Sequence, residues 1–243
     1  MNMPTDPVTL ALRIPGKWPH PKALVERLPA DYRIKGDSLL LPDGTPIELG
    51  ALKADNQFAQ IFRSSCRRPA TEDEQATVEA YTVNVTLSGP GGSMEAARTM
   101  MRAAAAIVRA GGAGVFIDNS ALAHGGKTWL AMTEDGGPDA LSFAFVAIVR
   151  GKSEVWTMGM HALGLREVYM RLADADNFDI IEVIRYLSEG EKPVMDGDLI
   201  SDLSGPRFQV FLTDSPEKLR GSPMHNPFGR LRLVNMRDVA ESN

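Results

Sequence analysis

The chain has 243 residues, of which 44% are hydrophobic and 23% charged, and its 26 basic and 31 acidic side chains give a formal net charge of −5. This composition is ordinary for a globular protein and excludes a disordered chain, a collagen-like repeat and a disulfide scaffold. The acidic excess argues against a nucleic-acid partner, because general nucleic-acid binding usually requires a basic face.

The cysteine count and the apolar stretches indicate the compartment. Cys66 is the single cysteine, so no intrachain disulfide is expected and a reducing environment is favoured. Met1 to Leu12 has no basic segment and two early prolines, which predicts no signal peptide. The longest apolar stretch, Leu141 to Val149, is far shorter than the ~20 residues of a membrane-spanning helix. We therefore expect a cytoplasmic protein without a membrane partner.

The first 66 residues are predicted to form a small β-α-β meander unit. Val8 to Ile14 has the pattern of a strand, and Pro21 to Leu28 suits a short helix because proline is favoured in the first helical turn. Further elements are predicted as three short strands at 32–34, 38–41 and 46–49 and a helix at 55–66. Residues 67–78 are predicted as a linker, although Thr71 to Glu74 has the pattern of a helix capping box.

A β-α-β unit follows the linker. Tyr81 to Ser88 alternates apolar and polar residues with period two, which indicates a half-buried strand. Ser93 is the expected N-cap of a helix from Met94 to Ala110, with apolar residues at helical spacing along one face. Gly111 and Gly112 end this helix, and Gly114 to Asp118 is predicted as the second strand.

The remaining residues predict further strands and one helix. Residues 119–140 are glycine-rich and are expected to be irregular, whereas Leu141 to Val149 is apolar on both faces, as in a central strand. Segment 165–172 fits a helix or a strand, and the flanking glycines favour the strand. The other predicted elements are strands at 154–158, 208–212 and 230–234 and a helix at 178–189 capped by Asn177.

Together these elements predict an α+β protein with a mainly antiparallel sheet. The order from residue 79 onward resembles a split β-α-β, ferredoxin-like plan with an added hairpin. Residues 79–243 are therefore predicted as the main α+β domain and residues 1–66 as a smaller α+β subdomain. We expect the two to share a sheet or a close interface, because the first is too small to bury much surface alone.

The segment from Ala121 to Thr128 has the strongest motif for chemistry. It fits a relaxed nucleotide-binding P-loop in which Ala121 replaces the first glycine. In that hypothesis the ligand-binding residues are His124, Gly125, Gly126, Lys127 and Thr128, with Lys127 contacting phosphates and His124 available as an acid-base group. The alternative interpretation is a glycine-rich surface loop with a solvated lysine, since little helical sequence follows Thr128.

A second candidate anion site is the turn before the helix at Met94. Gly91, Gly92 and Ser93 place free backbone N–H groups at a helix N-terminus, where an anion is favoured. The alternative is that these glycines only form the turn. The four histidines are widely separated and no H-E-x-x-H or C-x-x-C motif occurs, so neither a metal site nor a cofactor is predicted.

Two basic clusters have no assigned role. One contains Arg63, Arg67 and Arg68, and the other contains Arg230, Arg232 and Arg237. The simplest interpretation of both is solvated surface, given the overall acidic charge.

Three blocks of apolar and glycine positions between about residues 79 and 213 resemble an uncharacterised bacterial domain-of-unknown-function family. They are Tyr81 to Asp118, Trp156 to Glu167, and the helix ending at Gly190 with Pro193 to Asp198 after it. The resemblance implies a cytosolic α+β protein without an assigned activity, and no catalytic residues are transferred from it.

The sequence supports two functional hypotheses. The first is a non-enzymatic protein that acts by binding a protein partner or by self-association, since no catalytic constellation occurs and the strand-rich plan offers sheet edges. The second is a small-ligand or nucleotide-phosphate-binding enzyme that uses segment 121–128. We favour the first.

Overall fold

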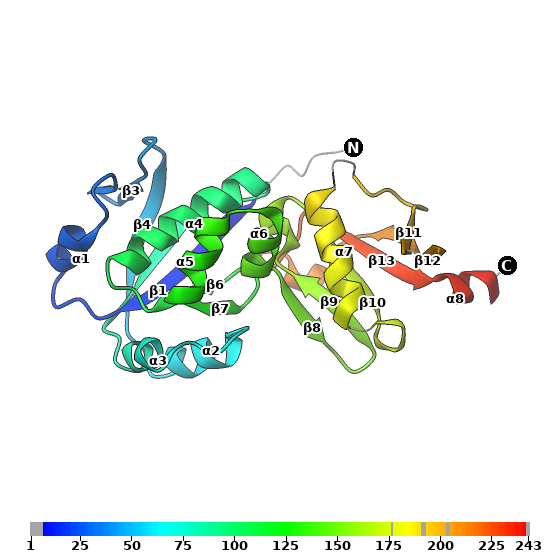
Figure 1. Ribbon diagram of the computed structural model, residues 1–243, viewed down its shortest axis with the longest axis horizontal. Coiled ribbons are helices and arrows are strands. Elements are labelled where there is room, and N and C mark those ends of the chain that lie inside the picture. Colours follow the sequence, from blue (N-terminus) through cyan, green and yellow to red (C-terminus); the bar gives the residue numbers. More distant parts are fainter. Residues whose placement is uncertain (1–6, 176, 191–192, 203–204, 242–243) are drawn as a thin grey trace.

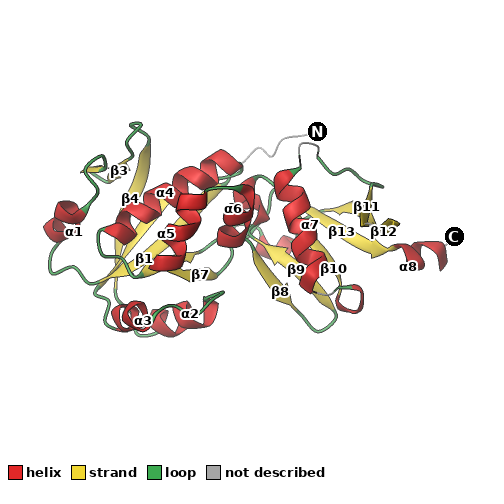
Figure 2. Cartoon of the chain, viewed as in Figure 1, coloured by secondary structure: helices red, strands yellow, loops and turns green. Residues whose placement is uncertain are grey.

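The computed structural model describes residues 7–175, 177–190, 193–202 and 205–241. Within these residues the chain forms eight α-helices, three short 3-10 helices and thirteen strands in two mostly antiparallel sheets, which confirms the predicted α+β class (Figure 2).

The first sheet has seven strands, and every pair of neighbours is antiparallel. In spatial order they are β2 (Arg33–Lys35), β3 (Ser38–Leu40), β4 (Pro46–Lys53), β5 (Val83–Pro90), β1 (Thr9–Gly16), β6 (Gly114–Ile117) and β7 (Leu122–Gly125). β1 lies between β5 and β6, so the predicted subdomain 1–66 and the predicted main domain contribute strands to one sheet. β5 and β6, joined by helix α4 (Met94–Arg109), are both antiparallel to β1. The wider ferredoxin-like plan stays a prediction.

Helices cover both faces of this sheet at the β6–β7 end. Figure 1 shows α4 and α5 (Gly126–Asp135) on one face, and α2 (Phe58–Ser65) and α3 (Glu72–Glu79) below the sheet. Val115 and Ile117 belong to the main core, whereas Phe116 belongs to a smaller cluster with Phe58 and Phe62 of α2. The sheet is therefore buried on both sides there. The remaining helix that accompanies the first sheet is α1 (Pro21–Arg27).

The second sheet has six strands and contains one parallel pair, β10–β13. In spatial order the strands are β11 (Leu199–Asp202), β12 (Gly205–Thr213), β13 (Arg230–Asn235), β10 (Glu167–Arg171), β9 (Glu154–Met158) and β8 (Ala147–Arg150). Helix α7 (Asn177–Glu189) lies across it and α8 (Met236–Glu241) follows β13 (Figure 1). Short 3-10 helices occur at Met160–Leu163, Leu172–Asp174 and Glu217–Leu219.

One continuous core joins the two sheets. It contains buried residues of β1 and α4, such as Leu12 and Met101, together with Val168 of β10 and Phe208 of β12. We call each sheet with its helices one half of the molecule. Helix α6 (Pro138–Phe145) lies between the two halves, and its Phe145 is fully buried.

Most predicted elements are present near their expected bounds. The capping box at Thr71, the Ser93 N-cap and the strand interpretation of 165–172 are confirmed. Helix α3 occupies most of the predicted linker 67–78. Strand β11 and helix α8 were not predicted, and the side chain of Asn177, the expected cap of α7, lies outside the described residues.

Two predictions about the middle of the chain are wrong. Residues 119–140 are not irregular but form β7, α5 and the start of α6. The expected strand Leu141 to Val149 is instead the end of α6 followed by β8. The helical part of this apolar stretch is buried except at Phe143, which is half-buried. A short apolar run does not distinguish such a helix from a central strand. The misleading glycines are there for close packing: a Cβ on Gly125 would collide with the Glu74 carboxylate, and one on Gly126 would press on Val108.

Candidate functional site

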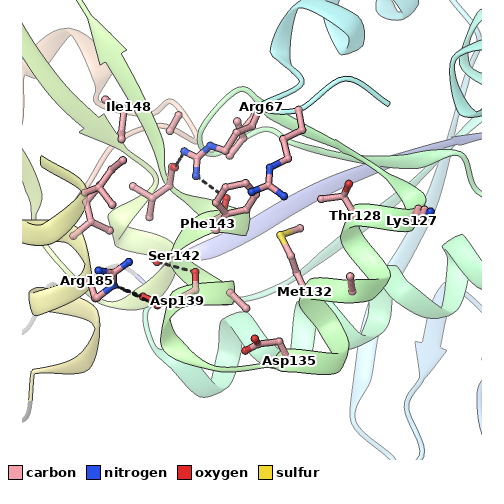
Figure 3. A pocket seen from close by; sticks show the side chains of 18 residues that line it. Arg67, Lys127, Thr128, Met132, Asp135, Asp139, Ser142, Phe143, Ile148 and Arg185 are labelled. Atoms are coloured by element: carbon pink, nitrogen blue, oxygen red, sulfur yellow. Dashed lines mark hydrogen bonds and ion pairs between the residues drawn. The ribbon is translucent and has the colours of Figure 1, made fainter. Parts of the chain in front are cut away.

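A cleft of about 870 Å³ lies where the two halves of the molecule meet (Figure 3). Its walls come from the segment after α2 and from β7, α5, α6, β8 and α7. Most lining side chains are apolar, and the charged and polar ones are Arg67, Arg68, Lys127, Thr128, Asp135, Asp139, Ser142 and Arg185.

Arg67 holds the end of α6. Its Nη1 donates to the Phe143 carbonyl at 3.0 Å and its Nη2 donates to the Val146 carbonyl. The last carbonyls of a helix have no partner within the helix and carry partial negative charge, so a guanidinium is well suited to this position. Burial, and secondly the adjacent charge of Arg68, lowers the pKa of Arg67 to about 10, so the group remains protonated at neutral pH.

Arg67 and Arg68 both stack on the ring of Phe143. The guanidinium carbons lie 4.7 Å and 5.0 Å from the ring centroid, within the range of cation–π contacts. Arg68 is exposed, whereas Arg67 is half-buried. In the described part of the chain neither guanidinium has an ion pair with a carboxylate. The cleft therefore has two cations at its wall that no acidic side chain neutralises.

The backbone fixes this arrangement from the first sheet. Cys66 forms an isolated parallel bridge with Ala123 of β7, and the Arg67 N–H donates to the Ala123 carbonyl at 3.3 Å. The chain after α2 is thus held beside the edge strand β7, which directs the two arginine side chains toward α6.

The opposite wall contains an ion-pair network in which one arginine meets two carboxylates. Asp139 of α6 lies 3.1 Å from Arg185 of α7, and Arg185 also contacts Glu182 at 2.6 Å. The Ser142 hydroxyl donates to the Asp139 carbonyl at 3.0 Å and is therefore already used within α6. The unneutralised positive charge is consequently on the arginine wall.

The predicted P-loop residues do not form a loop. His124 and Gly125 belong to β7, and α5 begins at Gly126. The Gly126 N–H donates to the Ala113 carbonyl at 2.9 Å, and the Lys127 N–H donates to Glu74 Oε1 at 2.7 Å. Glu74 of α3 thus occupies the position at which a phosphate would accept the same bond. Of the five predicted ligand-binding residues of this motif, only Lys127 and Thr128 line the cleft.

His124 is buried and does not line the cleft. Its Nε2 lies 3.0 Å from the Ala144 carbonyl, another carbonyl at the end of α6, and its Nδ1 has no hydrogen-bond partner in the described residues. Burial lowers the pKa of His124 to about 4, so its ring is neutral at physiological pH. This position suits structural support of α6 rather than proton transfer with a bound ligand.

The second predicted anion site lies away from the cleft. The Gly91 N–H donates to the Val8 carbonyl at 2.9 Å, and the Gly92 N–H donates to the Ala162 carbonyl at 3.1 Å. The Ser93 hydroxyl accepts from the Ala96 N–H at 3.1 Å. These glycine N–H groups therefore join segments of the protein, whereas the anion-site hypothesis requires them to be free.

In the residues that the structure describes, no group of three or more His, Cys, Asp or Glu side chains is placed to hold a metal ion. No helix among them is both long and apolar enough to cross a membrane.

The sequence did not indicate the role of Phe143. Its position in the apolar stretch 141–149 predicts a strand, and its arginine partners lie about 76 positions earlier in the chain. The sequence shows Arg63, Arg67 and Arg68 only as one basic cluster. In the structure Arg63 pairs with Glu79 of α3, so only Arg67 and Arg68 reach the cleft.

Comparison with protein-family models, with curated proteins and with solved structures found no match. The cleft is therefore interpreted from its own geometry.

Proposed function

We propose that this protein acts by binding a partner protein and that the cleft receives an acidic, partly apolar segment of that partner. One observation carries the proposal: Arg68 is exposed, stacked on Phe143, and without an acidic partner at the wall of a largely apolar cleft. A carboxylate from outside the chain would complete this arrangement, since guanidinium groups form strong charge-assisted hydrogen bonds with carboxylates.

The lining favours a polypeptide over a small ligand. Sites for small molecules usually contain several convergent polar groups that fix the orientation of the ligand. Here the buried Ser142 hydroxyl is already bonded within α6, and the aliphatic lining includes Ile181, whose side chain is 43% exposed. Aliphatic surface beside a stacked arginine is typical of protein interfaces, where arginine and aromatic residues are enriched.

The test uses fluorescent octapeptides that alternate Glu with Leu, and matched peptides that alternate Lys with Leu. We expect the acidic peptide to bind and the basic peptide not to bind, as measured by fluorescence anisotropy. Arg68→Ala should weaken the binding about tenfold or more, because a hydrogen bond to a charged group contributes about 1.5–3 kcal/mol.

Arg33→Ala is the matched control, because Arg33 is an exposed arginine on β2, far along the first sheet from the cleft. Equal affinity of the two peptides, or equal losses in the two variants, would contradict the proposal. MgATP and MgGTP are added in a separate thermal-shift arm. Stabilisation by either nucleotide that Lys127→Ala abolishes would support the small-ligand alternative instead.

A further inference from the structure

The outer face of the second sheet carries a row of aromatic and arginine residues that the cleft does not involve. Tyr169 of β10 is paired in register with Trp156 of β9 and with Arg232 of β13, and Arg232 is paired with Phe211 of β12. Paired residues on neighbouring strands point to the same face, so these four side chains form one line across four adjacent strands. We call Trp156, Tyr169, Arg232 and Phe211 the aromatic row.

The residues between them in sequence point to the other face. Val155, Val168, Val210 and Leu231 alternate with the aromatic row along the strands and are buried in the main core. The row itself is accessible: Phe211 is 38% exposed, Arg232 is exposed, and Trp156 and Tyr169 are half-exposed. The sheet therefore has one apolar face inside the protein and one aromatic face outside it.

Two cations on this face have no acidic partner among the described residues. The Arg230 guanidinium lies 3.8 Å from the centroid of the Tyr169 ring, and Arg230 and Arg232 share the outer face of β13. Neither forms an ion pair with a described residue. The positive charge beside the rings is thus available to a ligand.

The acidic groups of this face gather at its other end. Arg171 pairs with Asp174 at 2.7 Å and with Asp238, and Glu154 is in register with Arg171. These carboxylates line one hollow together with Tyr169, Phe211 and Arg232. A negatively charged ligand is consequently favoured on the Arg230 side of the aromatic row and disfavoured on the Arg171 side. The net charge of −5 does not describe this local distribution.

We propose that the aromatic row binds single-stranded nucleic acid, with bases stacked on Trp156 and Phe211 and phosphates contacted by Arg230 and Arg232. The ring of Tyr169 between them supports the Arg230 guanidinium, which lies over it. Strands in a sheet lie about 4.8 Å apart, so the row is about 14 Å long. Sheets that bind RNA stack two or three bases on aromatic side chains in this way. A single strand fits better than a duplex, because only unpaired bases offer their faces to side chains. A second copy of this chain is disfavoured because the unneutralised arginines would repel each other.

The experiment uses tryptophan fluorescence of the full chain, titrated with oligo(U) and oligo(dT) of twelve nucleotides. Trp18 and Trp129 are 6% and 0% exposed, so quenching on binding reports mainly on Trp156. We expect saturable quenching by at least one of the two oligonucleotides and none by a twelve-base-pair duplex. With two phosphate contacts on a single strand the salt slope is about −1.4, so affinity should fall about sevenfold between 50 and 200 mM NaCl.

Variants separate stacking from charge. Phe211→Ala and Phe211→Leu should both weaken binding about tenfold, because leucine keeps an apolar surface but removes the ring. Arg232→Ala should reduce the salt slope by about 0.7. Arg33→Ala, which removes the same charge elsewhere, and Arg68→Ala, which alters only the cleft, should leave binding unchanged. Circular dichroism of each variant verifies that it is folded.

Three results would overturn the proposal. The first is the absence of quenching with both oligonucleotides. The second is binding that Phe211→Leu and Arg232→Ala leave unchanged. The third is a concentration-dependent dimer in sedimentation velocity that Phe211→Ala dissociates, which would assign this face to contacts between copies of the chain.

Discussion

The Nδ1 atom of His161 lies 3.2 Å from Oε1 of Glu167, and both side chains are buried between the two halves of the molecule. His161 Nε2 lies 3.0 Å from the Pro223 carbonyl, so each ring nitrogen is within hydrogen-bond distance of an oxygen acceptor. Asn119, which follows β6, accepts from the Ala11 N–H and lies 3.3 Å from His161. This polar network therefore ties the second sheet to the first.

Removing His161 should destabilise the protein strongly. In His161→Ala the buried Glu167 carboxylate loses the ring nitrogen 3.2 Å away, and removing one member of a buried pair in this way costs about 3–5 kcal/mol. Urea unfolding followed by circular dichroism at pH 7 measures the change. The same substitution in a Glu167→Gln background should cost clearly less, because no buried charge is then left unpaired. Equal costs in both backgrounds would show that the two side chains do not interact.

Glu167 should also contribute to acid unfolding. Burial alone would raise the pKa of Glu167, but the hydrogen bond and charge of His161, with hydrogen bonds from Thr157 and Asn226, outweigh it and hold the pKa below its usual value. A carboxyl whose pKa is lowered by folding stabilises the protein above its unfolded pKa of about 4.3. That stabilisation is lost as pH falls from there through the lowered value, so Glu167→Gln should flatten the stability curve below about pH 4.

His124 should make stability depend on pH in a separate window. Its pKa is lowered to about 4 by burial, whereas an exposed histidine titrates near 6.5. Between these values the unfolded chain binds a proton that the folded chain does not, so stability falls as pH falls, by about 1.4 kcal/mol per pH unit at most. Denaturant titrations at pH 7, 6, 5 and 4.5 measure this slope.

His124→Gln is the informative substitution, because an amide can still donate to the Ala144 carbonyl. It should remove most of the slope between pH 6.5 and 4.5. The unaltered protein, titrated over the same pH values, is the control. A slope that persists in His124→Gln would mean that another group carries it.

Local sequence signals predicted the elements that are stabilised locally. The capping box at Thr71 and Glu74 and the Ser93 cap involve residues three apart, and α4 follows from apolar spacing alone. The cleft depends instead on contacts that no local pattern encodes. Phe143 meets Arg67 and Arg68 only because β7 holds the chain after α2 in place, and Glu74 reaches Lys127 across 53 positions.

The aromatic row could not be predicted from the sequence for a different reason. Trp156, Tyr169 and Phe211 lie on three predicted strands, but the line exists only through the order β9–β10–β13–β12 and its register. Strand order is set by the core on the opposite face, so the composition and the net charge could not reveal it.

Gly164 should be intolerant of any side chain. It has φ of +80°, and a Cβ would collide with the carbonyl oxygen of Gly92, which lies in the other half of the molecule. Gly36 also has positive φ, at +58°, but a Cβ added there would meet no atom within 4 Å. Gly36→Ala should therefore cost only the left-handed backbone penalty of about 1–2 kcal/mol.

Gly164→Ala should exceed that cost by about 2 kcal/mol or more, because backbone must also shift and the bond from Gly92 N–H to the Ala162 carbonyl is weakened. Thermal and urea unfolding of the two variants give the difference directly. If both variants lose the same stability, the close approach of Gly164 to Gly92 adds no cost to the penalty of the left-handed backbone conformation.

Glu74 explains why the start of α5 is not an open anion site, and this can be tested. Its carboxylate accepts from the Thr71 N–H at 2.8 Å and from the Lys127 N–H at 2.7 Å, so it caps α3 and α5 together. Glu74→Ala should therefore destabilise the protein by about 1–2 kcal/mol, as expected for loss of a cap. Glu72→Ala is the control, because Glu72 is an exposed residue of the same helical turn.

The vacated position should then behave as a weak anion site. Removing the carboxylate leaves the Lys127 N–H at a helix N-terminus, where anions are favoured by the free donor and the helix dipole. Sulfate at 50 mM should raise the melting temperature of Glu74→Ala more than that of the unaltered protein and of Glu72→Ala, since only the first has the position open. Equal shifts in all three proteins would mean that Glu74 does not stand where an anion would bind, and that the N-terminus of α5 is closed for another reason.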